Sequence, residues 1–142
     1  MMKTAKLVVL LSCLSLIVCA MPLAADEAAE KAAQAAAQKW LSLVDQGKYA
    51  ESWESAAAYF KNAVSEKQWL QSMKGARQPL GKLVSRELLA ARFVTSLPGA
   101  PDGRYVVIQY KTSFENKSSA TETVTPMLDR DQKWRVSGYF VK

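Results

Sequence analysis

Acid–base chemistry is the first function to test, because proton transfer in an enzyme needs a positioned side chain that titrates near neutral pH. The chain has no histidine, so carboxylates are the main remaining candidates. Glu87, Glu115 and Glu122 all fall on segments with strand-like composition. A carboxylate enclosed by apolar side chains can have its pKa raised enough to shuttle a proton. The spacing marks no pair, however, and the surroundings of Glu115 and Glu122 indicate ordinary surface positions, so we predict no catalytic residue.

Thiol and metal chemistry is limited by the position of the two cysteines, Cys13 and Cys19, close to the N-terminus. With no histidine and no other cysteine, catalytic triads, zinc sites and haem sites are not expected. The segment from Gly75 to Lys82 resembles a phosphate-binding loop only in outline. Five residues separate its glycines instead of four, and Leu83 replaces the Ser or Thr that would bind magnesium. We therefore predict no metal and no cofactor.

The N-terminus has the layout of a secretory signal peptide. Two lysines precede an uncharged, mostly apolar run from Leu7 to Ala20, which is shorter than the roughly 20 residues needed to span a membrane. Cleavage after Ala20 or Ala25 removes both cysteines, whereas a lipid-anchored form would retain Cys19. We expect a signal peptide over residues 1–25 and a secreted or periplasmic bacterial protein without a transmembrane segment after cleavage.

Charge is unevenly shared along the chain, whose formal net charge is +6. Asp26 to Glu66 contains seven acids and four bases, while Lys67 to Lys142 contains thirteen bases and six acids. The basic half suits anionic envelope polymers or lipid head groups. Acids alternate with these bases, as on an ordinary solvated surface. We predict no nucleic-acid partner; the partner, a small ligand or an envelope protein, is left open.

Three helices are predicted in the first half of the mature chain. Asp26 to Asp45 is rich in helix formers, and Gly47 suits the left-handed residue that ends a helix. Ser65 and Gln68 have the spacing of a capping box at the start of the third helix. Apolar residues at intervals of three and four define the buried sides: Ala29, Ala33, Ala36, Trp40 and Leu43; then Tyr49, Trp53, Ala56, Ala57 and Phe60; then Trp69, Met73 and Ala76.

Four antiparallel strands are predicted in the second half. The clearest is Arg104 to Glu115, which is rich in β-branched and aromatic residues and would place Val106, Ile108, Tyr110, Thr112 and Phe114 on one face. The other strands are Leu83 to Leu97, Ala120 to Leu128 and Lys133 to Val141, with a turn over Asn116 to Ser118. Pro126 predicts a bulge or an edge in the third strand. The fold class is therefore α+β, with three helices packed on a four-stranded sheet in one domain over residues 26–142.

A binding pocket, if there is one, is expected between the helices and the inner face of the sheet. Trp53 and Tyr110 could form its apolar walls, and Arg135 could supply a positive charge for an anionic ligand. The alternative is that Trp53 is a core residue, that Tyr110 finds one hydrogen-bond partner and that Arg135 points to water.

Several stretches of the chain also carry a resemblance to a known family. They are WLSLVDQGKYAESWESAAAYFK, VSEKQWL, RQPLGKLVSREL, SLPGAPDGRYVVIQYKTSFENK, ETVTPMLD and WRVSGYFVK. Together they resemble the bacterial family known as domain of unknown function 4019, over nearly the whole mature chain. That resemblance implies a secreted or periplasmic protein and brings no catalytic residues. More loosely, the order of elements is similar to the nuclear transport factor 2-like (NTF2-like) cone, in a reduced form that lacks a strand between the second and third helices.

Three functional hypotheses follow. The leading one is a non-enzymatic module that binds a small ligand or a protein partner at the helix–sheet cleft. The second is a cone-type isomerase or hydrolase that uses a buried carboxylate. The third is binding of anionic envelope polymers through the basic sheet half.

Overall fold

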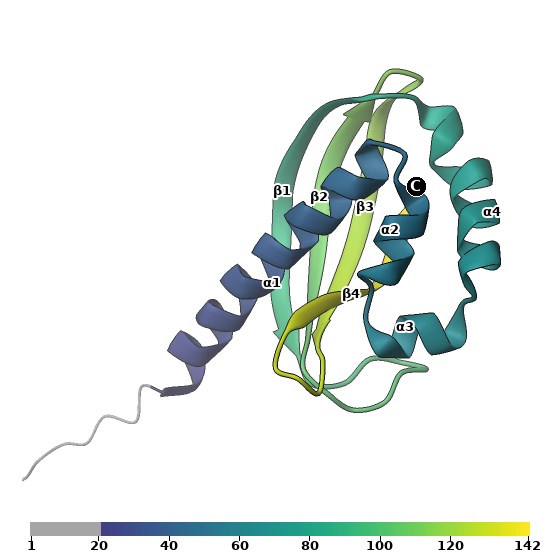
Figure 1. Ribbon diagram of the computed structural model, residues 1–142. Coiled ribbons are helices and arrows are strands. Elements are labelled where there is room, and N and C mark those ends of the chain that lie inside the picture. The colour runs from purple at the N-terminus through teal and green to yellow at the C-terminus, as the bar shows by residue number, and fades with distance from the viewer. Residues whose placement is uncertain (1–20) are drawn as a thin grey trace, which may run out of the picture.

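The computed structural model describes residues 21–142 and shows helices packed on one face of an antiparallel sheet (Figure 1). The predicted signal peptide lies mostly outside the described residues, as do both cysteines. Residues 21–25 form the first turns of the first helix. Within residues 21–142, no helix combines the length and the apolar character needed to cross a membrane. The α+β class predicted from the sequence is confirmed.

Residues 21–142 contain four α-helices rather than the predicted three. They are α1 (Met21–Asp45), α2 (Tyr49–Glu54), α3 (Ala58–Ala63) and α4 (Glu66–Ala76), followed by the short 3₁₀ helix η1 (Gln78–Leu80). The predicted second helix is interrupted because Ala57 is extended and its N–H donates to the carbonyl of Val136, 2.8 Å away. This bond from a distant strand replaces the bond that would have continued the helix.

Two helix boundaries follow from local sequence signals. Gly47 has φ of 73°, a left-handed conformation that glycine adopts without a Cβ clash, and it ends α1 as predicted. Ser65 accepts a hydrogen bond from the backbone N–H of Gln68, and the Gln68 side chain accepts one from the backbone N–H of Ser65. The predicted capping box at the start of α4 is therefore confirmed.

The sheet contains β1 (Leu83–Val94), β2 (Tyr105–Phe114), β3 (Lys117–Leu128) and β4 (Trp134–Val141), in that spatial order. All neighbouring strands are antiparallel. β3 begins earlier than predicted because Lys117 already pairs with Phe114 across a tighter turn. The predicted irregularity at Pro126 is confirmed by a register shift between Thr125 and Pro126.

The core lies between α1, α4 and the inner face of the sheet. Every residue that the alternation placed on the inner face of β2, from Val106 to Phe114, is at most 3 % exposed. The buried side of α1 is rotated slightly from the predicted stripe, so that Ala36 and Leu43 are only half-buried. Ala76, predicted to be buried in α4, is exposed. The buried residues of α1 and α4 are Ala29, Ala33, Ala37, Trp40, Leu41, Val44, Trp69 and Met73.

Candidate functional site

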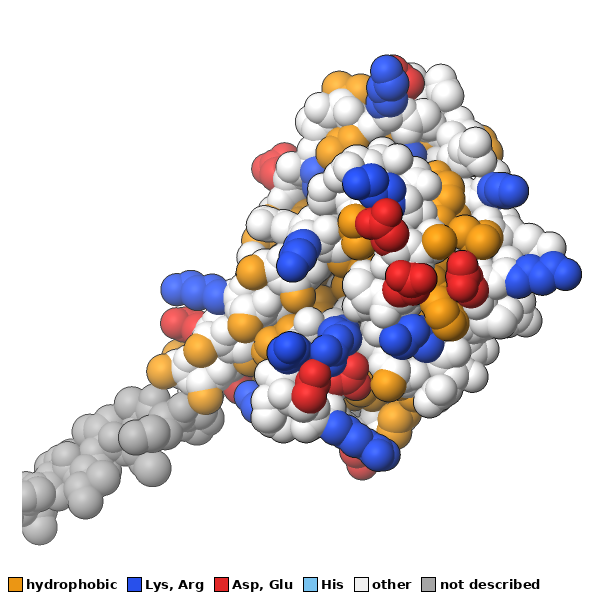
Figure 2. Space-filling view, in the orientation of Figure 1, with side chains coloured by type: hydrophobic (Ala, Val, Ile, Leu, Met, Phe, Trp, Pro, Cys, Tyr) orange, Lys and Arg blue, Asp and Glu red, His pale blue; other side chains and the backbone are white. Residues whose placement is uncertain are grey.

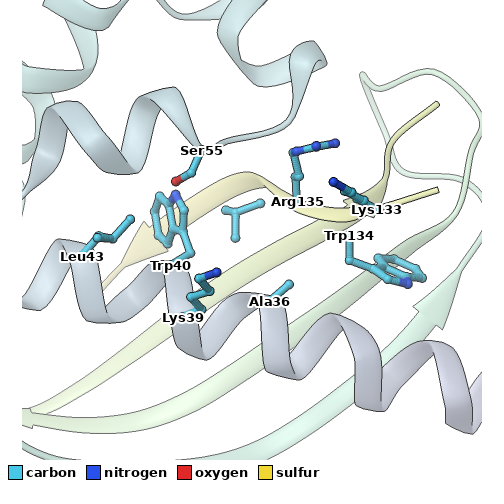
Figure 3. A pocket seen from close by; sticks show the side chains of 9 residues that line it. Ala36, Lys39, Trp40, Leu43, Ser55, Lys133, Trp134 and Arg135 are labelled. Atoms are coloured by element: carbon cyan, nitrogen blue, oxygen red, sulfur yellow. The ribbon is translucent and has the colours of Figure 1, made fainter. Parts of the chain in front are cut away.

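A hollow of about 200 Å³ lies where α1 runs beside β4 (Figure 3). From α1 it is lined by Ala36, Lys39, Trp40 and Leu43, whose spacing of three, four and seven residues places them on one side of the helix. Its other lining residues are Ser55, Lys133, Trp134, Arg135 and Val136. The floor is therefore apolar and aromatic, while the rim carries three cationic side chains and no carboxylate. We call this hollow the α1–β4 pocket.

The three cations of the pocket differ in how far they are neutralised. Arg135 donates to Asp129 Oδ2 at 3.2 Å and to the Asp131 carboxylate at 2.8 Å. The arginine lowers the pKa of Asp131 to about 2. Lys39 and Lys133 are exposed and form no ion pair within residues 21–142. Figure 2 shows basic and acidic side chains gathered over the β3–β4 hairpin beside α1. The two lysines are thus the charges left available to a ligand.

The structure does not bring the three predicted ligand-binding residues together. Arg135 lines the α1–β4 pocket, but Trp53 and Tyr110 are not part of its lining. Trp53 is half-buried, and its Nε1–H donates to the carbonyl of Val64 at 2.8 Å. Tyr110 is 3 % exposed. Its hydroxyl has no hydrogen-bond partner among the described residues, and burial raises its pKa. Neither aromatic residue is placed to contact a ligand in this pocket.

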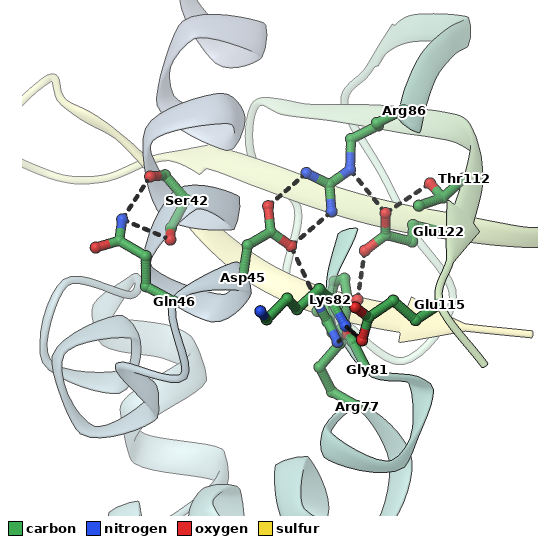
Figure 4. Close-up of polar contacts among 11 residues, drawn as sticks. Ser42, Asp45, Gln46, Arg77, Gly81, Lys82, Arg86, Thr112, Glu115 and Glu122 are labelled. Carbon is green, nitrogen blue, oxygen red and sulfur yellow. Dashed lines mark hydrogen bonds and ion pairs between the residues drawn. The ribbon is translucent and has the colours of Figure 1, made fainter. Parts of the chain in front are cut away.

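Glu122 is buried, and the prediction that it occupies an ordinary surface position is wrong. Its carboxylate is 0 % exposed and accepts hydrogen bonds from Arg86 Nε at 2.7 Å, Thr112 Oγ1 at 2.6 Å and the hydroxyl of Tyr139 (Figure 4). The signal was present in the sequence, because Ala120 and the residues two and four positions after Glu122 are apolar and share its face. Glu87 and Glu115 are exposed.

The ion pair between Arg86 and Glu122 continues to the end of α1 through Asp45. Arg86 donates to both oxygens of Asp45, at 2.7 and 3.0 Å, and Arg77 donates to the same carboxylate at 3.3 Å. Arg77 is itself buried; it donates to the Gly81 carbonyl at 2.6 Å, and its guanidinium lies 4.3 Å from the Phe114 ring centre. We call Arg77, Asp45, Arg86 and Glu122 the buried ionic chain; its formal charges sum to zero.

The buried ionic chain stabilises the charged form of Arg86. Burial alone would lower the pKa of Arg86, but hydrogen bonds to Asp45 and Glu122 raise it above its ordinary value. Burial, together with the charge of Glu122, raises the pKa of Tyr139. Three donors occupy the Glu122 carboxylate, and it is not among the residues lining the α1–β4 pocket. The carboxylate is therefore held as a structural hydrogen-bond acceptor.

The described part of the chain contains no cluster of side chains suited to binding a metal ion. Within residues 21–142, no three or more Asp, Glu, His or Cys side chains are grouped closely enough to hold an ion.

Fold and site together define a small α+β protein with a cationic, aromatic pocket beside its first helix. The family described as "Protein of unknown function (DUF4019)" matches residues 36–139, and the chain belongs to this family. The match begins at Ala36, which lines the pocket, and ends at Tyr139, whose hydroxyl donates a hydrogen bond to Glu122. No curated protein and no solved structure matches the chain.

Proposed function

We propose that the protein is a non-enzymatic binding module that holds a small anionic ligand with an apolar body in the α1–β4 pocket. The observation that carries this proposal is the placement of the unpaired Lys39 and Lys133 at the rim of an apolar floor. Cations fix the position of an anionic group, and apolar walls remove the rest of the ligand from water. The hollow of about 200 Å³ is smaller than the roughly 300–1,000 Å³ of pockets for drug-sized molecules, which favours a small ligand.

The proposed setting is the periplasm or the extracellular space of a bacterium, after removal of the leader over residues 1–25. The support comes from the sequence, in which basic residues precede an apolar run and small residues. We further propose that the fold is a reduced NTF2-like cone, because helices cover one face of an antiparallel sheet. In the periplasm or outside the cell, an acidic side chain of an envelope protein could occupy the α1–β4 pocket in place of a small anionic ligand.

Binding is favoured over catalysis by the surroundings of the carboxylates. A cone-type enzyme with a buried carboxylate would have to use Glu122, the one acidic residue among the buried residues of the described chain. Its oxygens already accept bonds from Arg86, Thr112 and Tyr139. The pocket in turn offers ammonium, guanidinium and indole groups and one serine, Ser55, whose hydroxyl donates to backbone carbonyls. These groups can bind an anion, but no carboxylate or imidazole is available there as a general base.

Calorimetry with phenylacetate tests the proposal, because this probe joins one apolar ring to one carboxylate. We expect saturable binding, and about tenfold weaker binding of the neutral analogue 2-phenylethanol, since a charge-assisted hydrogen bond contributes roughly 1.5–3 kcal/mol. Lys39→Ala and Lys133→Ala should each weaken phenylacetate binding by a similar factor. Both lysines are exposed, so the variants should fold normally.

Lys67→Ala on α4 is the matched control, because Lys67 is also exposed but does not line this pocket. It should leave phenylacetate binding unchanged. Equal binding of the acid and the alcohol, or unchanged binding in a Lys39→Ala/Lys133→Ala double variant, would show that the lysines do not select the ligand and would refute the assignment.

A further inference from the structure

β1 forms an open edge of the sheet. It is the first strand in the spatial order and pairs with β2 alone, so its other side has no strand beside it in the described chain. Three large apolar residues on it are exposed: Val84 by 65 %, Leu88 by 45 % and Leu89 by 55 %. An edge of twelve residues with exposed apolar side chains is a ready template for pairing with another strand.

The middle of β1, Glu87 to Arg92, is complementary to itself. Its sequence is ELLAAR. When it is placed antiparallel to a second copy of itself about a two-fold axis between Leu89 and Ala90, each Glu87 lies opposite Arg92. Each of the two leucines then lies opposite an alanine. Opposite charges and a large side chain facing a small one are the cross-strand pairs that stabilise antiparallel sheets.

The two faces of the sheet also match in this register. The partners on β2 place Glu87 and Arg92 on the outer face, and Leu88 and Ala91 on the inner face. The irregularity between Leu88 and Ala90 shifts the alternation at the centre of the strand. A two-fold axis through this irregularity keeps outer residues opposite outer residues and inner residues opposite inner residues.

The charged residues of this segment are exposed, and Glu87 has Lys111 of β2 directly opposite it on the paired side of β1. Glu87 and Arg92 are both exposed, and neither forms an ion pair with another residue in the range 21–142. Arg86, by contrast, points inward and is held by Asp45 and Glu122. The charges that β1 itself leaves without an ion pair are therefore the two that the register brings together.

The backbone at the edge is oriented for pairing. The N–H of Phe93 donates to Glu30 Oε1 at 3.1 Å, so it points away from β2 and towards the open side. In the monomer, Glu30 thus accepts a hydrogen bond from one of the backbone N–H groups on the open edge of β1. In the register above, Phe93 lies opposite Arg86 of the second copy, whose carbonyl offers this donor an alternative acceptor. The N-terminal part of α1 extends past β1 at the edge of the sheet (Figure 1), where it would cover an added strand.

From these observations we infer that the protein forms a symmetric dimer in which β1 pairs antiparallel with β1 of a second copy, joining the two sheets into one. The interface places Glu87 and Arg92 of the two copies in two reciprocal ion pairs. It also removes the exposed leucines from water.

Charge reversal tests this dimer on the protein expressed from the full 142-residue sequence. We expect light scattering and sedimentation to give a dimer for the unaltered protein. Glu87→Arg and Arg92→Glu should each weaken dimerisation by about tenfold or more, because each places two pairs of like charges opposite one another. Mixing the two variants in equal amounts should restore a dimer of one copy of each, since Arg then faces Glu at both positions.

Arg130→Glu is the control, because Arg130 is an exposed residue of the β3–β4 hairpin away from this edge, and it should leave dimerisation unchanged. Circular dichroism should show the same secondary structure for the unaltered protein and for every variant, so that a weakened dimer is not a loss of the fold. A monomer at about 100 μM unaltered protein, a concentration at which interfaces of standard affinity are saturated, would overturn the inference. So would a dimer that neither variant weakens, or a mixture that dimerises no better than each variant alone.

Discussion

The buried ionic chain and the α1–β4 pocket both contain charged side chains next to α1, but the charges are paired in the ionic chain and partly unpaired in the pocket. In the ionic chain, each arginine has a carboxylate partner within 3.3 Å; the Glu122 carboxylate is fully buried and that of Asp45 is largely buried. In the pocket, Lys39 and Lys133 reach solvent without a partner in the described chain. Compensated charge of this kind belongs to the packed interior, whereas uncompensated charge at a rim remains available for a ligand.

Removal of Glu122 should have the largest effect on stability. Glu122→Gln preserves the volume but leaves Arg86 without one of its two carboxylates, and breaking a buried pair in this way typically costs about 3–5 kcal/mol. We expect urea denaturation to show a loss of this size in the free energy of unfolding. Glu54→Gln, which alters an exposed carboxylate at the end of α2 that forms no ion pair in the described residues, should change stability by less than about 0.5 kcal/mol. Equal losses in both variants would show that the Glu122 carboxylate contributes no more to stability than an exposed one.

Removal of the Asp45 charge should have the second-largest effect on stability. Asp45→Asn removes the charge that Arg77 and Arg86 share, but the side chain is 16 % exposed, so water partly replaces the lost partner. We expect a loss of about 1.5–3 kcal/mol, the range for hydrogen bonds to charged groups. Chemical denaturation of the Asp45→Asn/Glu122→Gln double variant checks the coupling: the two losses should be non-additive, because both residues bind Arg86. Additive losses in the double variant would show that the buried ionic chain does not act as a unit.

The lysines of the pocket should have little effect on stability. Lys39→Ala and Lys133→Ala should shift the free energy of unfolding by less than about 0.5 kcal/mol, because neither side chain has a charged partner in the described residues. The same denaturation experiment measures this. A loss as large as that for Asp45→Asn would mean that these lysines are structural and that the pocket is not a site of free charge.

Asp131 should give the smallest effect, visible as a titration rather than as a change in fold. Its pKa is lowered from 3.8 to about 2, chiefly by the hydrogen bond from Arg135. Because the folded-state value is depressed, the stability that this contact contributes is present above about pH 4 and is lost as the pH falls towards 2. Carboxyl carbon NMR shifts measure the pKa directly. Arg135→Ala should return it towards 3.8, and a pKa unchanged by the substitution would assign the shift to another cause.

Local signals in the sequence predicted much of the fold. The inner face of β2 follows from strict alternation, and the start of α4 follows from Ser65 and Gln68, because these features depend on neighbouring residues alone. The break before α3 could not be predicted in the same way, since it depends on a bond between Ala57 and a strand far along the chain.

The candidate site was harder to predict for the same reason. The charge of Arg135 makes it a candidate for binding an anion, but its separation from Tyr110 depends on the strand order, in which β3 lies between β2 and β4. The alternation of β3 indicates the burial of Glu122, because Ala120 and Val124 share its face, but the threonines between these residues are equally typical of a surface strand. Lys39 and Lys133 carry no sequence signal, because an exposed lysine looks the same whether or not a hollow lies beside it.

The bond from Ala57 to Val136 connects one wall of the pocket to an edge strand. Val136 lines the hollow and Ser55 lies two residues before Ala57, so the amide of Ala57 can exchange its hydrogen with water only when this wall opens. A ligand that fills the hollow would slow that opening. The exchange rate of a single backbone amide therefore reports occupancy, even for a ligand that has no chromophore and changes no secondary structure.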